Sequence, residues 1–143
     1  MILEIKATEL HQLTILLENA GLPTEGLSVE NGPVYLLKEK ERAIGGIALE
    51  ICRPDGGLLR SLVVDASRQG KGQGQALVET LVQRATQDSL SALYLLTETA
   101  APFFAKLGFE TIDRSIVPQT LQQTDEFTSI CPSSATVMRL SLD

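Results

Sequence analysis

The sequence of 143 residues contains no tryptophan, one histidine and two cysteines, and these shortages limit its metal and thiol chemistry. A zinc site usually draws its ligands from cysteine and histidine at close spacing. His11 and the widely separated Cys52 and Cys131 do not form such a pattern, so no metal is expected. The two cysteines form no CxxC pair and are expected to be reduced thiols.

Long apolar runs are missing as well. No stretch approaches the roughly 20 residues that cross a bilayer, and the start, MILEIKATEL, carries charges where a signal peptide needs an apolar segment. Basic excess is also absent, because the formal net charge is −6. Since nucleic-acid binding usually requires a basic face, the sequence predicts a cytoplasmic protein with neither a nucleic-acid nor a membrane partner.

What the chain does contain is enough apolar surface for one folded domain. Hydrophobic residues make up 43% and aromatic residues only 4%, so an aliphatic core is expected. Short apolar runs and helical patterns follow one another in the order β, α, β, β, β, α, β, α, β, β. We therefore predict an α+β fold in which residues 1–143 form a single domain, with a mixed central sheet of about six to seven strands.

One loop is unusually rich in glycine and locally basic. The stretch SRQGKGQGQALV, residues 67–78, lies between a predicted strand at 58–64 and a predicted helix. A helix N-terminus has unpaired N–H groups and a partial positive charge, and glycines allow a ligand to approach the backbone. Arg68 and Lys71 add charge, so the loop predicts a phosphate site. The glycine spacing fits neither a Walker loop nor a dinucleotide fingerprint, and a glycine-rich turn without a ligand is the alternative.

The hexapeptide QGKGQG, residues 69–74, resembles the acyl-coenzyme A loop of the GNAT family of N-acetyltransferases. The longer segment LLRSLVVDASRQGKGQGQALV is similar to the strand, loop and helix at the centre of that family, and FFAKLGF is similar to its FYEKLGF signature. LPTEGL, YLLTETAAPFFAKLGFETIDR and CPSSATVMRL further resemble the acetyltransferases of arsenic-resistance gene clusters. The segment LLTETAAPFFAKLGFETIDRSIVP also resembles the acetyltransferase domain of N-acetylglutamate synthases.

This resemblance implies an enzyme that transfers acetyl from acetyl-coenzyme A directly to the amine of a small, amino-acid-like acceptor, with a link to arsenic resistance. Helices would cover both faces of the sheet, which would splay after the strand at 58–64. The N–H of Leu62 would then face the thioester oxygen, Val64 would bond the pantetheine arm, and the N–H groups of residues 70–75 would hold the pyrophosphate. The cofactor-binding residues implied in this way are Leu62, Val63, Val64, Gln69, Gly70, Lys71, Gly72, Gln73, Gly74 and Gln75. A homodimer is common in the family.

For the catalytic and acceptor-binding residues, the sequence leaves alternative roles open. Glu50 interrupts an apolar strand, so it is either a general base in the cleft or a carboxylate on the solvent face. Arg60 lies on a predicted central strand, where it would bind an acceptor carboxylate or pair with Glu50. Ser61 is expected on the opposite face of that strand. Glu25 and Arg114 fall in loops that the family often uses for acceptors, although solvated surface charge is the alternative for both.

One residue departs from the family pattern. Many members use a tyrosine in FYEKLGF to protonate the departing thiolate, and this chain has Phe104 there. A covalent acetyl-cysteine route would need an activating histidine, and His11 falls on the predicted first helix. The departure keeps a second function open, a non-catalytic domain that binds acetyl-coenzyme A as a sensor or scaffold. A third is an acetyltransferase that modifies proteins.

Overall fold

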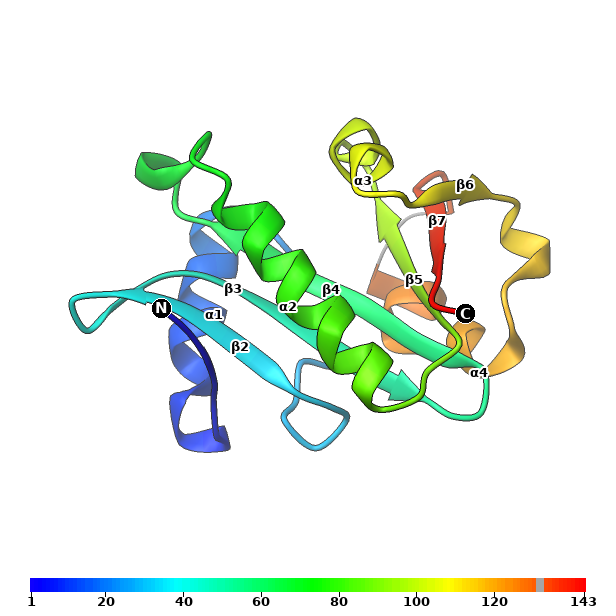
Figure 1. The fold of residues 1–143 in the computed structure, drawn as a ribbon, viewed down its shortest axis with the longest axis horizontal. Helices are drawn as coiled ribbons and strands as arrows, with labels where there is room; N and C mark the ends of the chain where they lie inside the picture. Colours follow the sequence, from blue (N-terminus) through cyan, green and yellow to red (C-terminus); the bar gives the residue numbers. More distant parts are fainter. Residues whose placement is uncertain (131–132) are drawn as a thin grey trace. The chain divides into compact units, whose positions relative to one another are not determined.

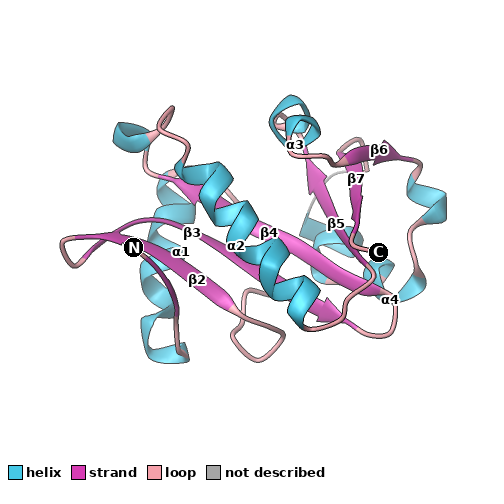
Figure 2. Cartoon of the chain, viewed as in Figure 1, coloured by secondary structure: helices cyan, strands magenta, loops and turns pink. Residues whose placement is uncertain are grey.

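The structure is a computed structural model that describes residues 1–130 and 133–143. Within these residues, seven strands form one sheet in the order β1-β2-β3-β4-β5-β7-β6 (Figures 1 and 2). The strands are β1 (Ile2–Glu4), β2 (Val34–Glu39), β3 (Arg42–Cys52), β4 (Gly56–Val64), β5 (Ala92–Thr97), β6 (Glu110–Ile112) and β7 (Thr136–Ser141). β4 pairs with β5 in parallel, whereas β5 pairs with β7 antiparallel. The predicted α+β class with a mixed sheet is confirmed.

Four α-helices and several single turns connect the described strands. The helices are α1 (Leu10–Asn19), α2 (Gln73–Gln87), α3 (Ala101–Lys106) and α4 (Gln119–Gln122). The shorter turns are η1 (Ala7–Glu9), η2 (Ala66–Arg68), η3 (Arg114–Ile116) and the π-helical turn η4 (Glu126–Ile130). Among the described residues, no helix combines the length and the apolar character needed to cross a membrane.

The chain divides into two compact units. The first contains residues 1–50 and 59–83, and the second contains residues 51–58 and 84–143. β3 and β4 each contribute residues to both units.

In the first unit, α1 and α2 pack on opposite faces of β3, and two adjacent glycines identify the faces. A Cβ atom on Gly45 would point towards Leu77 of α2, at 3.4 Å from its Cδ1 atom. A Cβ atom on Gly46 would lie only 2.5 Å from Cδ1 of Leu13, which belongs to α1. Because successive residues of a strand point to opposite faces, helices cover both faces of this strand, and the absent side chains allow them to approach closely.

The core of the first unit on the α1 side is aliphatic. Leu13 and Leu17 stand one helical turn apart on α1 and are fully buried. Burial of each contributes about 1.5–3 kcal/mol. The buried cluster that they join contains Ile5, Leu13, Leu17, Val34, Leu36, Ala48 and Val63.

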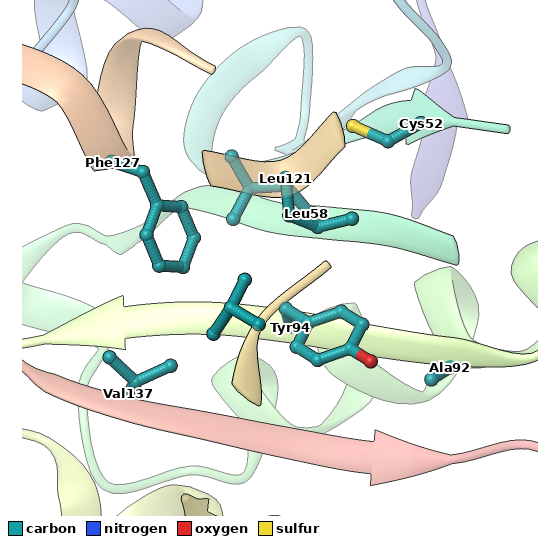
Figure 3. Packing of buried hydrophobic residues seen from close by; sticks show 8 residues of the cluster. Cys52, Leu58, Ala92, Tyr94, Leu121, Phe127 and Val137 are labelled. Carbon is teal, nitrogen blue, oxygen red and sulfur yellow. The ribbon is translucent and has the colours of Figure 1, made fainter. Parts of the chain in front are cut away.

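The second unit is built on β5, β7 and β6. The β5–β7 ladder runs from Ala92 opposite Ser141 to Thr97 opposite Thr136. The first four residues of β5 are buried, which agrees with the continuous apolar character of its sequence ALYLLT. Figure 3 shows the core of this unit, where Leu121 of α4 and Phe127 of η4 lie over Leu58 and Tyr94. The segment after Pro118 therefore contributes apolar residues to this core.

Candidate functional site

The strand that precedes the glycine loop has an irregular backbone at Ser61. Its φ of 61° lies in the left-handed region, which is rare for a serine and costs free energy that the surrounding structure must offset. The irregular backbone also brings Ser61 towards its neighbour, since Nε of Arg60 donates to Oγ of Ser61 at 3.2 Å. The prediction that these two side chains point to opposite faces is therefore wrong, because it assumed regular strand geometry through this position.

The three residues after this irregularity complete β4. Val63 is buried at 7% exposure, while Leu62 and Val64 are half-buried. The carbonyl of Val63 faces β3, where a Cβ atom added to Gly45 would lie 2.9 Å from it. The β4–β5 pairs, Gly57 with Leu93 and Leu58 with Tyr94, lie at the other end of the strand. The backbone roles of Leu62 and Val64 stay predictions.

The glycine loop leads directly into α2. Gly70 and Gly72 have φ values of 83° and 77°, which L side chains rarely adopt. A Cβ atom on either would meet no atom within 4 Å, so open space adjoins the backbone. The first hydrogen bond of the helix runs from the N–H of Ala76 to the carbonyl of Gly72. The N–H groups of residues 73–75 therefore belong to the helix N-terminus, where backbone donors lack intrahelical acceptors, and the first turn carries no acidic residue.

Gln69 connects the loop to the end of β4. Its side-chain Nε2 donates to the carbonyl of Val64 at 3.1 Å. Lys71 is exposed between the two glycines of positive φ. The predicted cofactor-binding residues of β4 and the loop therefore form one continuous segment of the first unit, and an exposed cation accompanies its backbone donors. This arrangement suits a bound phosphate group.

The second cation of the loop, Arg68, is held by a carboxylate. Its Nε donates to Oε2 of Glu39 at 3.3 Å, and its NH2 donates to Oε1 of the same residue. The hydrogen bond from Arg68 and the positive charges of Arg68, Lys71 and Lys40 lower the pKa of Glu39, and the carboxylate in turn raises the pKa of Arg68. Arg68 thus ties the loop to the end of β2.

Arg60, Glu50 and Glu25 meet in the first unit. Arg60 is buried at 3% exposure, and its NH1 lies 3.6 Å from Oε1 of Glu50. Its NH2 donates to the backbone carbonyl of Glu25 at 2.6 Å. The sequence left open whether Arg60 pairs with Glu50, and the structure shows that it does. The contact with the Glu25 carbonyl was not predicted, because a backbone acceptor gives no side-chain signal.

The remaining candidate residues lie in the second unit or apart from the loop. Arg114 stacks over the ring of Phe127, with Cζ 5.5 Å from its centroid. Phe104 is buried between Phe103 and Phe109, with ring centroids 5.1 and 5.6 Å away. These contacts give both residues a packing role, and the acceptor role of Arg114 stays a prediction.

Cys52 and His11 lie on different elements of the described structure, β3 and α1. Cys52 is buried and is not part of a disulfide, and Cys131 lies outside the described residues. His11 is exposed on α1. Across residues 1–130 and 133–143, no three side chains of histidine, cysteine, aspartate or glutamate are grouped so that they could hold a metal ion.

Known proteins share both the sequence pattern and the fold. An amino-acid acetyltransferase of Mycobacterium tuberculosis is 36% identical over 86 residues, which cover 59% of this chain and 47% of that relative. The chain therefore spans about half the length of that curated relative. The structure of N-acetylglutamate synthase from Neisseria gonorrhoeae, complexed with coenzyme A and N-acetyl-glutamate, matches with a TM-score of 0.83 at 21% identity, over 100% of this chain and 35% of the synthase chain.

A second solved structure has nearly the same extent as this chain. It is a Mycobacterium tuberculosis protein in complex with coenzyme A, and it matches with a TM-score of 0.81 at 20% identity, over 99% of this chain and 98% of its own.

Residues 30–111 match the family model described as the acetyltransferase (GNAT) domain. That range contains β2, β3, β4, the glycine loop, α2, β5 and α3. The chain belongs to the GNAT acetyltransferase family.

Proposed function

We propose that residues 1–143 act as a single domain that transfers acetyl from acetyl-coenzyme A to the amine of a small acceptor. The observation that carries this proposal is the open glycine loop before α2, where Gly70 and Gly72 hold positive φ and leave space beside the backbone. A protein of the same fold and nearly the same extent binds coenzyme A, which supports a one-domain function.

The residues of the loop and of β4 fit this cofactor without any metal. The backbone donors of the loop and of the first turn of α2 would bind its pyrophosphate, with Lys71 adding positive charge. The N–H of Val64 would bond the pantetheine arm, while the carbonyl of Val64 accepts from Gln69. The N–H of Leu62 would face the thioester oxygen and stabilise the negative charge that develops there. Bound acetyl-coenzyme A supplies the acetyl group as a thioester.

The proposed base is Glu50. Its carboxylate would take a proton from the acceptor ammonium, and the neutral amine would then attack the thioester carbonyl. A C–N bond forms, the C–S bond breaks, and coenzyme A leaves as a thiolate, while the attacking nitrogen, now cationic, must lose a second proton to become the amide. Phe104 carries no hydroxyl that could protonate this thiolate, so we propose that water takes the second proton from the nitrogen and passes it to the thiolate.

The acceptor is proposed to resemble an amino acid. The amino-acid acetyltransferase relative and the structural match to N-acetylglutamate synthase support this class of acceptor. In the first unit, Glu25 and Arg60 are the residues proposed on the acceptor side. An acceptor role for Arg114 of the second unit stays a separate prediction from the sequence. A link to arsenic resistance, a homodimer and a cytoplasmic location stay predictions from the sequence.

A second function, a sensor or scaffold that binds acetyl-coenzyme A without catalysis, is favoured by one observation. Phe104 places a buried hydrocarbon ring where many family members carry the acid. Such a protein would need the glycine loop but neither Glu50 nor an acceptor site.

A thiol-release screen tests the proposal. The purified chain is incubated with acetyl-coenzyme A and the amino acids, together with arsenical and phosphinic amino-acid analogues. We expect free coenzyme A to appear with at least one of these amines, and calorimetry to show binding of the cofactor. Binding of the cofactor without release for any amine would favour the sensor, and failure to bind the cofactor would overturn both functions.

A further inference from the structure

Arg60 is a buried arginine whose side chain contacts three separate parts of the first unit. Its Nε donates to Ser61 at 3.2 Å, its NH2 donates to the carbonyl of Glu25 at 2.6 Å, and its NH1 lies 3.6 Å from Glu50. Burial of a guanidinium is costly, and the hydrogen bonds of Nε and NH2 together with the charge of Glu50 offset part of that cost. The contact with Glu25 spans 35 positions of sequence. It joins β4 to the loop of residues 22–33 that connects α1 with β2, called here the 22–33 loop.

A tight turn presents the Glu25 carbonyl to this arginine. The N–H of Leu27 donates to the carbonyl of Thr24 at 3.3 Å, and Gly26 has a φ of 75°. A hydrogen bond across four residues with glycine at positive φ in third position is the pattern of a type II turn. The carbonyl of Glu25 belongs to the central peptide of that turn, so the turn itself does not use it. It accepts instead from Arg60, while the residue as a whole stays exposed.

We propose that Arg60 is a positioning residue, which holds the 22–33 loop through the Glu25 carbonyl and holds Glu50 through the ion pair, without binding the acceptor itself. The inference rests on the proposed function, in which this loop and Glu50 form the acceptor side. One guanidinium fixes both groups, so the position of the loop and the position of the carboxylate depend on each other. Leu27 and Val29 also pack against the buried cluster around Leu13, so loss of the arginine loosens the loop without detaching it.

Amide hydrogen exchange, measured by NMR on the ligand-free protein, tests this role directly. The N–H groups of Leu27 and Glu30 report on the loop, because they donate to Thr24 O and to Ser28 Oγ within it. In Arg60→Met we expect both amides to exchange about tenfold faster or more, as loss of a hydrogen bond from a charged donor implies. The matched control is Arg53→Met, because Arg53 also donates to a backbone carbonyl, that of Asp88, at 3.3 Å. In this control, the exchange rates of the Leu27 and Glu30 amides should equal those of the wild type.

Steady-state kinetics separates positioning from direct binding of the acceptor. A positioning role predicts that Arg60→Met raises the acceptor KM by about tenfold or more while the affinity for coenzyme A stays within about twofold. If the acceptor KM rises but the exchange of Leu27 and Glu30 does not change, Arg60 is a direct ligand and the proposal is wrong. If the wild-type chain acetylates nothing, the proposed function fails, and the exchange data still decide whether Arg60 holds the loop.

A second variant removes the contact without changing the arginine, in case Arg60→Met does not fold. Gly26→Ala places a side chain at a φ of 75°, which should turn the central peptide away from Arg60. We expect the amides of Leu27 and Glu30 to exchange faster in this variant. The increase in exchange rate in the double variant Gly26→Ala and Arg60→Lys should be smaller than the two single effects combined, because both changes weaken the same contact. Wild-type exchange in Gly26→Ala, or full additivity, would overturn the proposal.

Discussion

The side chain of Gln69 donates a hydrogen bond to the backbone carbonyl of Val64, with 3.1 Å between Nε2 and the oxygen. The bond joins the start of the glycine loop to the last residue of β4, so the loop is tethered to the strand whose backbone is proposed to bind the pantetheine arm. A net hydrogen bond of this kind contributes about 1 kcal/mol. The shape of the proposed cofactor site therefore depends in part on one glutamine side chain.

Gln69→Leu removes this donor and keeps a similar side-chain volume. We expect the affinity for coenzyme A to fall about fivefold, because the loop must then pay the cost of ordering when the cofactor binds. Isothermal calorimetry measures the change, and Gln83→Leu on the exposed surface of α2 is the control. Equal affinity in Gln69→Leu and the wild type would show that the bond does not shape the site.

Gly74→Glu should separate the stability of α2 from cofactor binding. A carboxylate in the first helical turn interacts favourably with the partial positive charge there, and glutamate has a higher helix propensity than glycine. The stability of the helix should therefore increase by about 0.5–1 kcal/mol. The same charge repels a pyrophosphate, and we expect the affinity for coenzyme A to fall about 100-fold or more. Thermal unfolding measures the change in stability, and calorimetry measures the change in affinity for coenzyme A.

The control for Gly74→Glu is Gln83→Glu, which adds the same charge near the other end of α2. It should leave the affinity for coenzyme A close to that of the wild type. Unchanged affinity in Gly74→Glu would remove the N-terminus of α2 from the proposed site.

The ion pair of Glu39 with Arg68 makes a prediction about pH. Because Arg68 lowers the pKa of Glu39 below its ordinary value of 4.5, the pair stabilises the folded state above that value. The contribution is lost as the pH falls through the lowered pKa. The difference in stability between wild type and Glu39→Gln should therefore vanish in strong acid, grow as the pH rises towards 4.5, and stay constant above it.

An NMR titration of the Glu39 carboxyl group measures the pKa directly. In Arg68→Gln, the pKa of Glu39 should move back towards its ordinary value, because the hydrogen bond that lowers it is gone. The pair is exposed, so added salt should reduce the wild-type shift. A pKa of Glu39 that is the same in wild type and Arg68→Gln would contradict the pairing.

The sequence predicted the parts of the fold that depend on local pattern. Short apolar runs located the strands, and the helical pattern after the glycine loop located α2, whose buried face includes Leu77, Leu81 and Ala85. The glycine loop was recognisable because positive φ at Gly70 and Gly72 requires the residue type that the sequence shows.

The contacts that organise the candidate site could not be read in the same way. Ser61 adopts positive φ although serine gives no signal for it, so strand alternation misplaced its side chain. Arg60 bonds a backbone carbonyl 35 positions away, and every residue type offers such a carbonyl. Long-range contacts to the main chain leave no trace in the identity of the acceptor residue, and only the folded structure reveals them.

Phe104→Tyr tests whether the missing acid limits turnover. The ring is 5% exposed and packs edge-to-face against Phe103 and Phe109. A hydroxyl buried among these rings without a partner should cost about 1–3 kcal/mol, so we expect a lower Tm and no gain in turnover. Phe103→Tyr is the control, because that neighbour is only half-buried. A turnover increase of about tenfold or more in Phe104→Tyr would show that the hydroxyl reaches the departing thiolate.

Glu50→Gln tests the proposed base with a nearly isosteric side chain. We expect turnover to fall about 100-fold or more, because the amide cannot accept the proton of the acceptor ammonium. The affinity for coenzyme A should stay within about twofold, since the backbone of the loop and of β4 binds it. The change also removes the negative charge that lies 3.6 Å from the buried Arg60, which should lower stability by about 1–3 kcal/mol. Turnover must therefore be measured well below the Tm of the variant.

The control for Glu50→Gln is Glu79→Gln, an exposed residue on α2, which should keep wild-type turnover and stability. Raising the pH offers a second readout. A larger neutral fraction of the amine reduces the need for a base, so the deficit of Glu50→Gln should shrink as the pH approaches the pKa of the acceptor. Wild-type turnover in Glu50→Gln at neutral pH would remove Glu50 from the reaction and leave it as the partner of Arg60.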